Sequence, residues 1–261
     1  MAQWQSGVVQ QHIHWDETFH SLQITTTSPL AFKAGQYTRV GLEIDGGLVA
    51  RPYSFVNPPT EPQLEFYFNT VPDGPLSNRL AQLEIGDSLE IATPVAGFMV
   101  LDELPQGRDL WLFATGTAIG PYLSMLGCEE LWRQFDRVLL VWGTPFNHQQ
   151  HYAPVLHQFA ERHGDRFRWL ACLSREPLAE TFDTPSLPDS AARLIYGRMT
   201  TALEDGQLEQ QLGVQLAVDI SQVLLCGNPA MVKEMLLILK RRGLTKNLRR
   251  NPGQVTVERY W

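Results

Sequence analysis

The chain has 261 residues, of which 44% are hydrophobic and 19% charged, with 20 glycines and 17 prolines. This balance is typical of a folded globular protein and excludes a disordered chain, a collagen and a coiled coil. The net charge of -7 argues against a general nucleic-acid-binding protein.

The first hundred residues are predicted to form short strands separated by turn residues. The strands begin roughly every ten residues, with glycine, proline and aspartate between them, which is typical of an antiparallel barrel. A helix interrupts the pattern, because Leu76, Leu80 and Leu83 have helical spacing directly after the turn PDGP at 72–75. The predicted strands are the region of Val8 and Ile13 and the segments 22–27, 36–42, 64–71 and 88–93.

After Asp102 the pattern changes to alternating strands and helices, which favours a parallel sheet with helices on both faces. The predicted strands are 110–114, 138–142, 168–173 and 223–226, and the predicted helices are 119–131, 200–212 and 229–242. We place the domain boundary within 104–109. The expectation is an antiparallel β-barrel domain over residues 1–101 and an α/β nucleotide-binding domain over 102–261, with a surface loop at 176–190.

No apolar run approaches the roughly 18 residues that a membrane-spanning helix needs. The first residues, MAQWQSGVV, lack the basic end and apolar stretch of a secretory signal, so we expect a cytoplasmic protein. Cys128, Cys172 and Cys226 are odd in number and far apart, which leaves neither a disulfide framework nor a CxxC metal site. We therefore expect reduced thiols and no metal ion.

Ligands of open parallel sheets bind at the carboxyl ends of the strands, and three of the predicted strand ends are rich in glycine. They are GTAIGP at 116–121, GTP at 143–145 and CGNP at 226–229. Glycine allows a ligand to approach the backbone, and a helix that begins just beyond offers free N–H groups to a phosphate. Taken singly, each segment fits an ordinary strand-to-helix turn equally well.

In the first half, the segment RPYS at 51–54 brings a cation, an aromatic ring and a hydroxyl into four residues. A guanidinium suits a pyrophosphate, and a tyrosine ring suits a planar ligand. Taken alone, the segment also fits a strand with a surface arginine and a packed tyrosine. A second candidate anion site is the start of the helix near Leu76 and Ser77, whose first amides have no partner within the helix.

Read together, these motifs resemble those of the ferredoxin (or flavodoxin)–NADP reductase family, in particular the bacterial type that ends in an aromatic residue. RPYS at 51–54 resembles the family's flavin motif RxYS, and TVPDGPLS at 70–77 resembles its second flavin segment. GTAIGPYL at 116–123 and CGNPAMV at 226–232 resemble its nicotinamide-domain motifs, and VERYW at 257–261 resembles its C-terminus. The resemblance covers essentially the whole chain and implies bound FAD and NADP(H).

The resemblance implies roles for individual residues of the flavin half. Arg51 would pair with the FAD pyrophosphate, Tyr53 would stack on the isoalloxazine ring, and Ser54 would hydrogen-bond near flavin N5. Tyr260 and Trp261 would cover the flavin and its adenine from the other side, so Tyr260 would have to move aside for the nicotinamide. The other implied FAD contacts are Pro52, Tyr67, Pro75, Leu76, Ser77 and Thr117.

For the second half, the resemblance implies that Ser174, Arg175 and Arg198 contact the 2′-phosphate of NADP(H). Two charge-assisted hydrogen bonds of about 1.5–3 kcal/mol each would favour NADPH over NADH by a factor on the order of 10² to 10⁴. Close relatives place an arginine where this chain has Thr144 and Pro145, so a weaker preference is expected. Further implied NADP contacts are Thr144, Gly227 and Asn228. The implied catalytic residues are Ser54, Cys226 and Glu258. Cys226 also fits a core residue, and Glu258 also fits a solvated residue of a strand.

The implied reaction is electron exchange between NADPH and ferredoxin or flavodoxin, by hydride transfer between nicotinamide C4 and flavin N5 followed by one-electron steps. Two alternatives stay open. One is an NAD(P)H–flavin reductase of the same superfamily, and the other is a non-catalytic module that binds nucleotide or nucleic acid through a basic C-terminal region.

Charge is unevenly distributed along the chain. Residues 1–103 contain 4 basic and 12 acidic residues, whereas residues 233–261 contain 8 and 2. The stretch KRRGLTKNLRR at 240–250 fits a solvated helix end, a nucleic-acid contact or a docking patch for an acidic redox partner. Because ferredoxins and flavodoxins are acidic, we favour docking, with neither nucleic acid nor membrane as a partner, and we expect a monomer.

Overall fold

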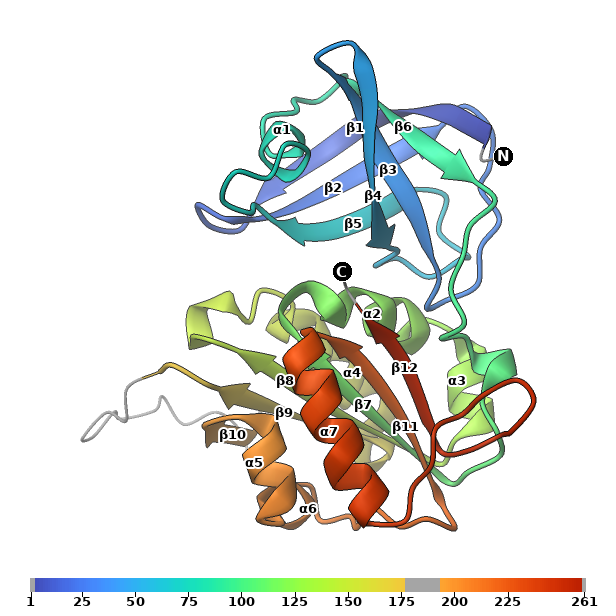
Figure 1. The fold of residues 1–261 in the computed structure, drawn as a ribbon, viewed down its shortest axis with the longest axis vertical. Helices are drawn as coiled ribbons and strands as arrows, with labels where there is room; N and C mark the ends of the chain where they lie inside the picture. Colours follow the sequence, from blue (N-terminus) through green and yellow to red (C-terminus); the bar gives the residue numbers. More distant parts are fainter. Residues whose placement is uncertain (1–2, 177–192, 260–261) are drawn as a thin grey trace. The chain divides into compact units, whose positions relative to one another are not determined.

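The computed structural model describes residues 3–176 and 193–259, which form two compact units. The first unit contains Met1–Asp102 and Ile119–Glu129, and the second contains Glu103–Ala118 and Glu130–Trp261. An antiparallel sheet builds the first and a parallel sheet builds the second, so the predicted fold class is confirmed (Figure 1). Tyr260, Trp261 and most of the predicted loop at 176–190 lie outside the described residues.

The first unit is a six-stranded antiparallel sheet in the order β4-β3-β6-β1-β2-β5. Beyond β4 the chain turns onto the opposite edge strand: Val56 N donates to Glu65 O (2.9 Å), and Glu65 N donates to Asn57 Oδ1 (2.7 Å). These bonds curl the sheet into a half-barrel. Its elements are β1 (Gln3–His14), β2 (Phe19–Thr26), β3 (Tyr37–Ile44), β4 (Gly47–Ser54), β5 (Leu64–Asn69), the helix α1 (Ser77–Leu80) and β6 (Ser88–Thr93).

Alternation of side chains gives this half-barrel its core. In β5, Leu64, Phe66 and Phe68 are buried and belong to one apolar cluster, as the period of two predicts. Strand β4 agrees with the alternative interpretation of RPYS at 51–54 as a strand, although Pro52 removes a ladder donor and the apolar run is short. It lies at an edge of the sheet, where proline is tolerated, and it follows a two-residue hairpin in which Asp45 (φ 52°) and Gly46 (φ 80°) are both left-handed.

The second unit is a six-stranded parallel sheet in the order β10-β9-β8-β7-β11-β12. The predicted helix 119–131 is in fact two helices, and so is the predicted helix 200–212, which breaks at the left-handed Gly206 (φ 76°). Strands β10 and β12 and helix α4 were not predicted. Helix α2 (Gly120–Leu126) belongs to the first unit, although it follows β7 in the chain. The elements of the second unit are β7 (Asp109–Thr115), α3 (Glu129–Gln134), β8 (Arg137–Thr144), α4 (Ala153–His163), β9 (Phe167–Leu173), β10 (Arg193–Tyr196), α5 (Met199–Glu204), α6 (Gln207–Leu212), β11 (Ser221–Gly227), α7 (Pro229–Arg241) and β12 (Val255–Arg259).

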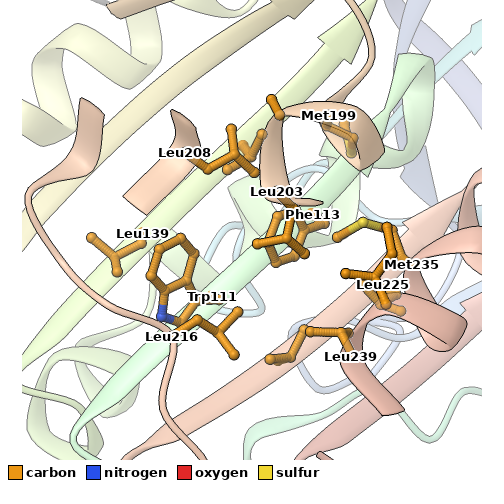
Figure 2. Packing of buried hydrophobic residues seen from close by; sticks show 14 of the residues in the cluster. Trp111, Phe113, Leu139, Met199, Leu203, Leu208, Leu216, Leu225, Met235 and Leu239 are labelled. Carbon is orange, nitrogen blue, oxygen red and sulfur yellow. The ribbon is translucent and has the colours of Figure 1, made fainter. Parts of the chain in front are cut away.

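Helices cover both faces of the parallel sheet. On one face, α5, α6 and α7 pack their apolar side chains against alternate residues of the central strands, including Trp111 and Phe113 of β7 (Figure 2). On the other face, Trp132 of α3 makes an edge contact with Phe167 of β9, at 6.0 Å between ring centroids. This two-sided burial explains why the central strands are continuous apolar runs.

A buried carboxylate fastens the amino ends of β7 and β8. Asp109 is fully buried, and its two oxygens accept hydrogen bonds from Nε and Nη2 of Arg137 (2.7 and 2.8 Å) and from Nη2 of Arg108 (2.9 Å). Burial alone would raise the pKa of Asp109, but these hydrogen bonds and charges outweigh it and hold the pKa below its usual value.

We therefore expect Asp109→Asn to lower the free energy of unfolding by about 3 kcal/mol, the lower end for breaking a buried pair, because both arginines keep contact with water. Because the folded pKa is depressed, this stability is present above the unfolded pKa of about 3.9 and is lost as the pH falls through the folded value. Urea unfolding between pH 3 and 7 measures both effects. Asp165→Asn is the control, since that side chain is fully exposed, and an equal loss there would contradict the prediction.

Candidate functional site

The carboxyl ends of five parallel strands surround a pocket of about 330 Å³ in the second unit. Such an edge is where ligands bind in open α/β sheets. The lining residues come from the ends of β7 to β11 and from the first turns of α5 and α7. They are Thr115, Gly116, Gly143, Thr144, Pro145, Cys172, Ser174, Arg175, Gly197, Arg198, Met199, Thr200, Asn228, Ala230, Met231 and Glu234.

The strand order reverses between β7 and β11, and the backbone there is held close. Asn228 N donates to Thr115 Oγ1 (2.8 Å), while Asn228 Oδ1 accepts from Ala230 N (2.8 Å) and caps α7. Gly227 has φ 129°, and a Cβ at that position would lie 2.1 Å from Thr115 Oγ1, so only glycine fits. The 13-residue helix α7 thus begins at the pocket, where its first N–H groups favour a phosphate.

The structure brings together the three residues that the sequence assigned to a 2′-phosphate. Ser174, Arg175 and Arg198 line the pocket and are exposed. Backbone bonds position the first two, since Ser174 N donates to Thr144 O and Arg175 N donates to Pro145 O, each at 2.9 Å. Among the described residues, neither guanidinium has a carboxylate within ion-pair distance, so both charges are available to an anion.

Thr144 also lines the pocket, but its hydroxyl is already occupied. It donates to Phe146 O (3.0 Å) and accepts from Gln150 Nε2 (2.8 Å). The side chain therefore shapes the loop after β8, and its hydroxyl is not free for a nucleotide.

Sequence reasoning missed three polar lining residues, Thr115, Thr200 and Glu234. Thr200 Oγ1 is buried and has no hydrogen-bond partner within the part of the chain that the structure describes. A donor left in this state fits a polar ligand, because an unsatisfied buried hydroxyl costs about 1–3 kcal/mol. Its position two residues after Arg198 was the available signal.

The residues assigned to catalysis in this unit lie on neighbouring strands. Cys226 of β11 is fully buried and pairs in register with Glu258 of β12, which is half-buried. Neither belongs to the pocket lining, and Thr117, half-buried in the 3-10 turn Gly116–Ile119, does not either. Cys172 does line the pocket, but burial raises the pKa of its thiol to about 12, so it is unreactive at neutral pH.

In the first unit, the end of β4 presents the predicted flavin residues. Arg51 is exposed, and its Nη1 donates only to the neighbouring carbonyl of Ala50 (2.9 Å), with no carboxylate partner among the described residues. Tyr53 makes edge contacts with Phe66 and Phe68, at 6.4 and 5.9 Å between ring centroids, and burial raises its pKa to about 12. Its hydroxyl is therefore neutral.

The hydroxyl of Ser54 is a buried polar group of this unit that suits a bound ligand. Its residue is only 7% exposed, and its Oγ is buried without a hydrogen-bond partner in the described chain. Pro52, two residues before Ser54, is exposed. A buried hydroxyl next to an aromatic ring and an unpaired guanidinium fits a flavin, which offers a ring, a hydrogen-bonding edge and a pyrophosphate.

The other predicted flavin contacts of this unit differ in which of their groups are free to bind a ligand. Tyr67 of β5 is buried, stacks on Phe19 at 5.8 Å, and has its pKa raised by burial and by Asp16. Ser77 Oγ accepts from Val71 N (3.0 Å), so this hydroxyl already closes the turn before α1. The N–H groups of Leu76 and Ser77 donate to no group in the described chain, whereas Pro75 is exposed and has no N–H to offer.

The first unit is an antiparallel half-barrel whose side chains suit a flavin, and the second is an α/β unit with a pocket that suits a nucleotide. Together they define a two-domain flavin- and nicotinamide-dependent oxidoreductase. Residues 8–99 match the family model of the oxidoreductase FAD-binding domain, and residues 112–236 match that of the oxidoreductase NAD-binding domain. The flavodoxin/ferredoxin–NADP reductase of Escherichia coli K12 is 42% identical over 100% of both chains. The chain belongs to the flavodoxin/ferredoxin–NADP reductase family.

Two further similarities agree with this assignment. The ferredoxin–NADP reductase of Pseudomonas aeruginosa is 31% identical, over 94% of this chain and 93% of that protein. The crystal structure of a ferredoxin NADP⁺ reductase from Neisseria gonorrhoeae with bound FAD and NADP has a TM-score of 0.89 at 26% identity and covers 100% of both chains. The predicted family is thereby confirmed. No helix in the described residues is long and apolar enough to cross a membrane.

Proposed function

We propose that the protein exchanges electrons between NADPH and ferredoxin or flavodoxin, using FAD. The observation that carries the proposal is the gathering of Ser174, Arg175 and Arg198 in the pocket of a chain that is 42% identical to a flavodoxin/ferredoxin–NADP reductase. Two guanidiniums that have no carboxylate partner among residues 3–176 and 193–259 suit a ligand with an additional phosphate, which is what separates NADPH from NADH.

In the flavin half, we infer that Tyr53 supports the ring, Arg51 binds the pyrophosphate, and Ser54 donates a hydrogen bond at N5. When bound, FAD supplies the chemistry that converts a two-electron donor into a one-electron donor. The chain contributes by orientation, because the contacts of Tyr53 with Phe66 and Phe68 hold its ring in place before any ligand arrives. Tyr67 and the N–H groups of Leu76 and Ser77 complete the proposed site.

In the nucleotide half, we infer that the first turn of α7, with Gly227 and Asn228, binds the nucleotide's pyrophosphate. Glu258 and Cys226 are proposed to act near the nicotinamide, since both lie at the carboxyl ends of their strands. For Cys226 the proposed contribution is steric, because its side chain is fully buried.

We propose that the acidic carrier docks at the basic stretch 240–250 of a monomer. Three of its cations are already engaged: Arg241 with Glu204, Arg242 with Glu209 (2.8 Å), and Arg249 with Glu103 (3.6 Å). The net field for docking therefore comes mainly from the exposed side chains of Lys240, Lys246 and Arg250.

Reversing two of these charges, in Lys240→Glu/Lys246→Glu, is expected to raise the KM for an acidic carrier by about 3- to 10-fold at low ionic strength. The effect should shrink as salt rises, because surface charges are screened over about 10 Å at 0.1 M. Steady-state reduction of flavodoxin at several salt concentrations measures it. Arg162→Glu, an exposed cation on α4, is the control, and an equal rise in KM there would place docking elsewhere.

The activity itself is tested by the visible spectrum of the purified protein under anaerobic conditions, before and after addition of NADPH or NADH. A bound-flavin spectrum that NADPH bleaches faster than NADH, and that flavodoxin restores, is the expected result. Equal bleaching by NADH would favour the alternative NAD(P)H–flavin reductase. A protein that remains colourless even after FAD is added would overturn the proposal and favour the binding module.

A further inference from the structure

Three histidines lie together on one face of the half-barrel, outside the proposed flavin site. His12 and His14 are two residues apart on β1, so their side chains point to the same face. His20 of β2 is the register partner of His14 across the ladder. Strand pairing therefore gathers three imidazoles that are up to eight residues apart in sequence.

The rings are in direct contact. The ring centroids of His12 and His14 are 3.8 Å apart, and the two rings are stacked. Nε2 of His12 lies 3.2 Å from Nδ1 of His20. One ligand nitrogen from each of the three residues lies within 4.8 Å of the other two. Imidazole nitrogens so close together compete for the same protons, or they share a cation.

The hydrogen bonds fix which nitrogen of His12 is available. Nδ1 of His12 lies 2.7 Å from the carbonyl of Leu83, which can only accept, so Nδ1 carries the proton. Nε2 is then left with its lone pair directed toward His20. This is the arrangement found in metal-binding histidines, whose second ring nitrogen donates to a carbonyl and thereby fixes the ring's orientation.

We propose that His12, His14 and His20 form a binding site for a divalent transition-metal ion of the Zn²⁺ or Cu²⁺ type. Both ions can be coordinated by three imidazole nitrogens, with a water molecule at the fourth position. Zn–N bonds of about 2.0–2.1 Å require nitrogens about 3.3 Å apart, which the His12–His20 pair already satisfies. The exposed His14 is able to rotate toward the pair and close the remaining gap.

The carboxylate of Asp16, in the adjacent turn, interacts electrostatically with His20. Asp16 Oδ1 accepts hydrogen bonds from Thr18 N (2.7 Å) and Phe19 N (2.8 Å), and so holds the turn between β1 and β2. An ion at this site would fasten β1 to β2, and through His12 it would also fasten the segment that contains Leu83. The expected consequence is a more stable first unit.

This inference departs from our expectation that the chain holds no metal ion. That expectation rested on the spacing of the cysteines alone, and HIH at 12–14 has no standard metal-binding spacing with His20. Only the ladder register between β1 and β2 shows that the third ring faces the other two.

Isothermal titration of the tag-free, full-length, chelator-treated protein with Zn²⁺ tests the proposal. We expect one ion per chain, with affinity reduced at least 10-fold in His14→Asn. His14 is the appropriate target, because it is the exposed member of the cluster and its replacement removes only the ring contacts with His12 and His20. The matched control is His148→Asn, another exposed histidine in the turn Asn147–Gln149, which should leave the affinity unchanged.

Electron paramagnetic resonance of the Cu²⁺-loaded protein supplies a second readout, since oxidised flavin has no unpaired electron. Nitrogen hyperfine structure from imidazole ligands is expected in the wild type and in His148→Asn, and it should weaken in His14→Asn. Zn²⁺ affinity that is unchanged in His14→Asn, or equally reduced in His148→Asn, would overturn the site. So would the absence of stoichiometric Zn²⁺ binding in the wild type.

Discussion

Replacing both Arg175 and Arg198 by alanine is expected to lower the ratio of kcat/KM for NADPH to that for NADH by a factor on the order of 10² to 10⁴. Both guanidiniums lie at the pocket edge without a carboxylate partner among the described residues, so each can make a charge-assisted hydrogen bond of about 1.5–3 kcal/mol. The loss should appear as a higher KM for NADPH, because a group far from the reacting atoms binds ground state and transition state alike.

The single variants separate the two contributions, and Arg162→Ala on α4 serves as a control cation outside the pocket. The kinetics with NADH should barely change in any of them. A ratio that stays constant in the double variant would show that the 2′-phosphate is bound elsewhere. The wild-type ratio is itself expected near the lower end of this 10² to 10⁴ range, since Pro145 and the occupied hydroxyl of Thr144 replace an arginine after β8.

The strands of the parallel sheet could be predicted from sequence wherever an apolar run marked a strand that is buried on both faces. The buried strands β7, β8, β9 and β11 are apolar runs bounded by polar residues, and packing on both faces makes that pattern necessary. The elements that were missed, or predicted only as an alternative, lack this signal. Helix α4 buries only Leu156 completely, β10 has four residues, and β4 contains a proline that only its edge position makes acceptable.

The candidate site was predicted less completely, because sequence names residues but does not state which of their atoms are occupied. Ser77 and Thr144 were reasonable candidates, yet both hydroxyls already serve the backbone of their own loops. Conversely, only its position two residues after Arg198 marks Thr200 in the sequence, yet its hydroxyl lacks a partner in the described structure. Tertiary hydrogen bonding decides this difference, and local patterns do not record it.

Ser54→Ala is expected to slow the reduction of bound FAD by NADPH by a factor on the order of 10², the usual cost of removing one positioned donor. The hydroxyl is buried and has no partner in the described chain, so a flavin would be the group that satisfies it. The same reasoning predicts the opposite effect on the flavin-free protein. There the substitution removes an unsatisfied polar group, so the free energy of unfolding should stay the same or rise by about 1 kcal/mol.

Ser77→Ala is the matched control, because its hydroxyl accepts a hydrogen bond from Val71 N. That variant should lose about 1 kcal/mol of stability in the flavin-free protein and retain most of its rate of flavin reduction. Stopped-flow reduction and urea unfolding of both variants distinguish the two roles. If Ser54→Ala destabilised the flavin-free protein as much as Ser77→Ala, the Ser54 hydroxyl would have a partner in the protein itself, and its assignment to the flavin would be wrong.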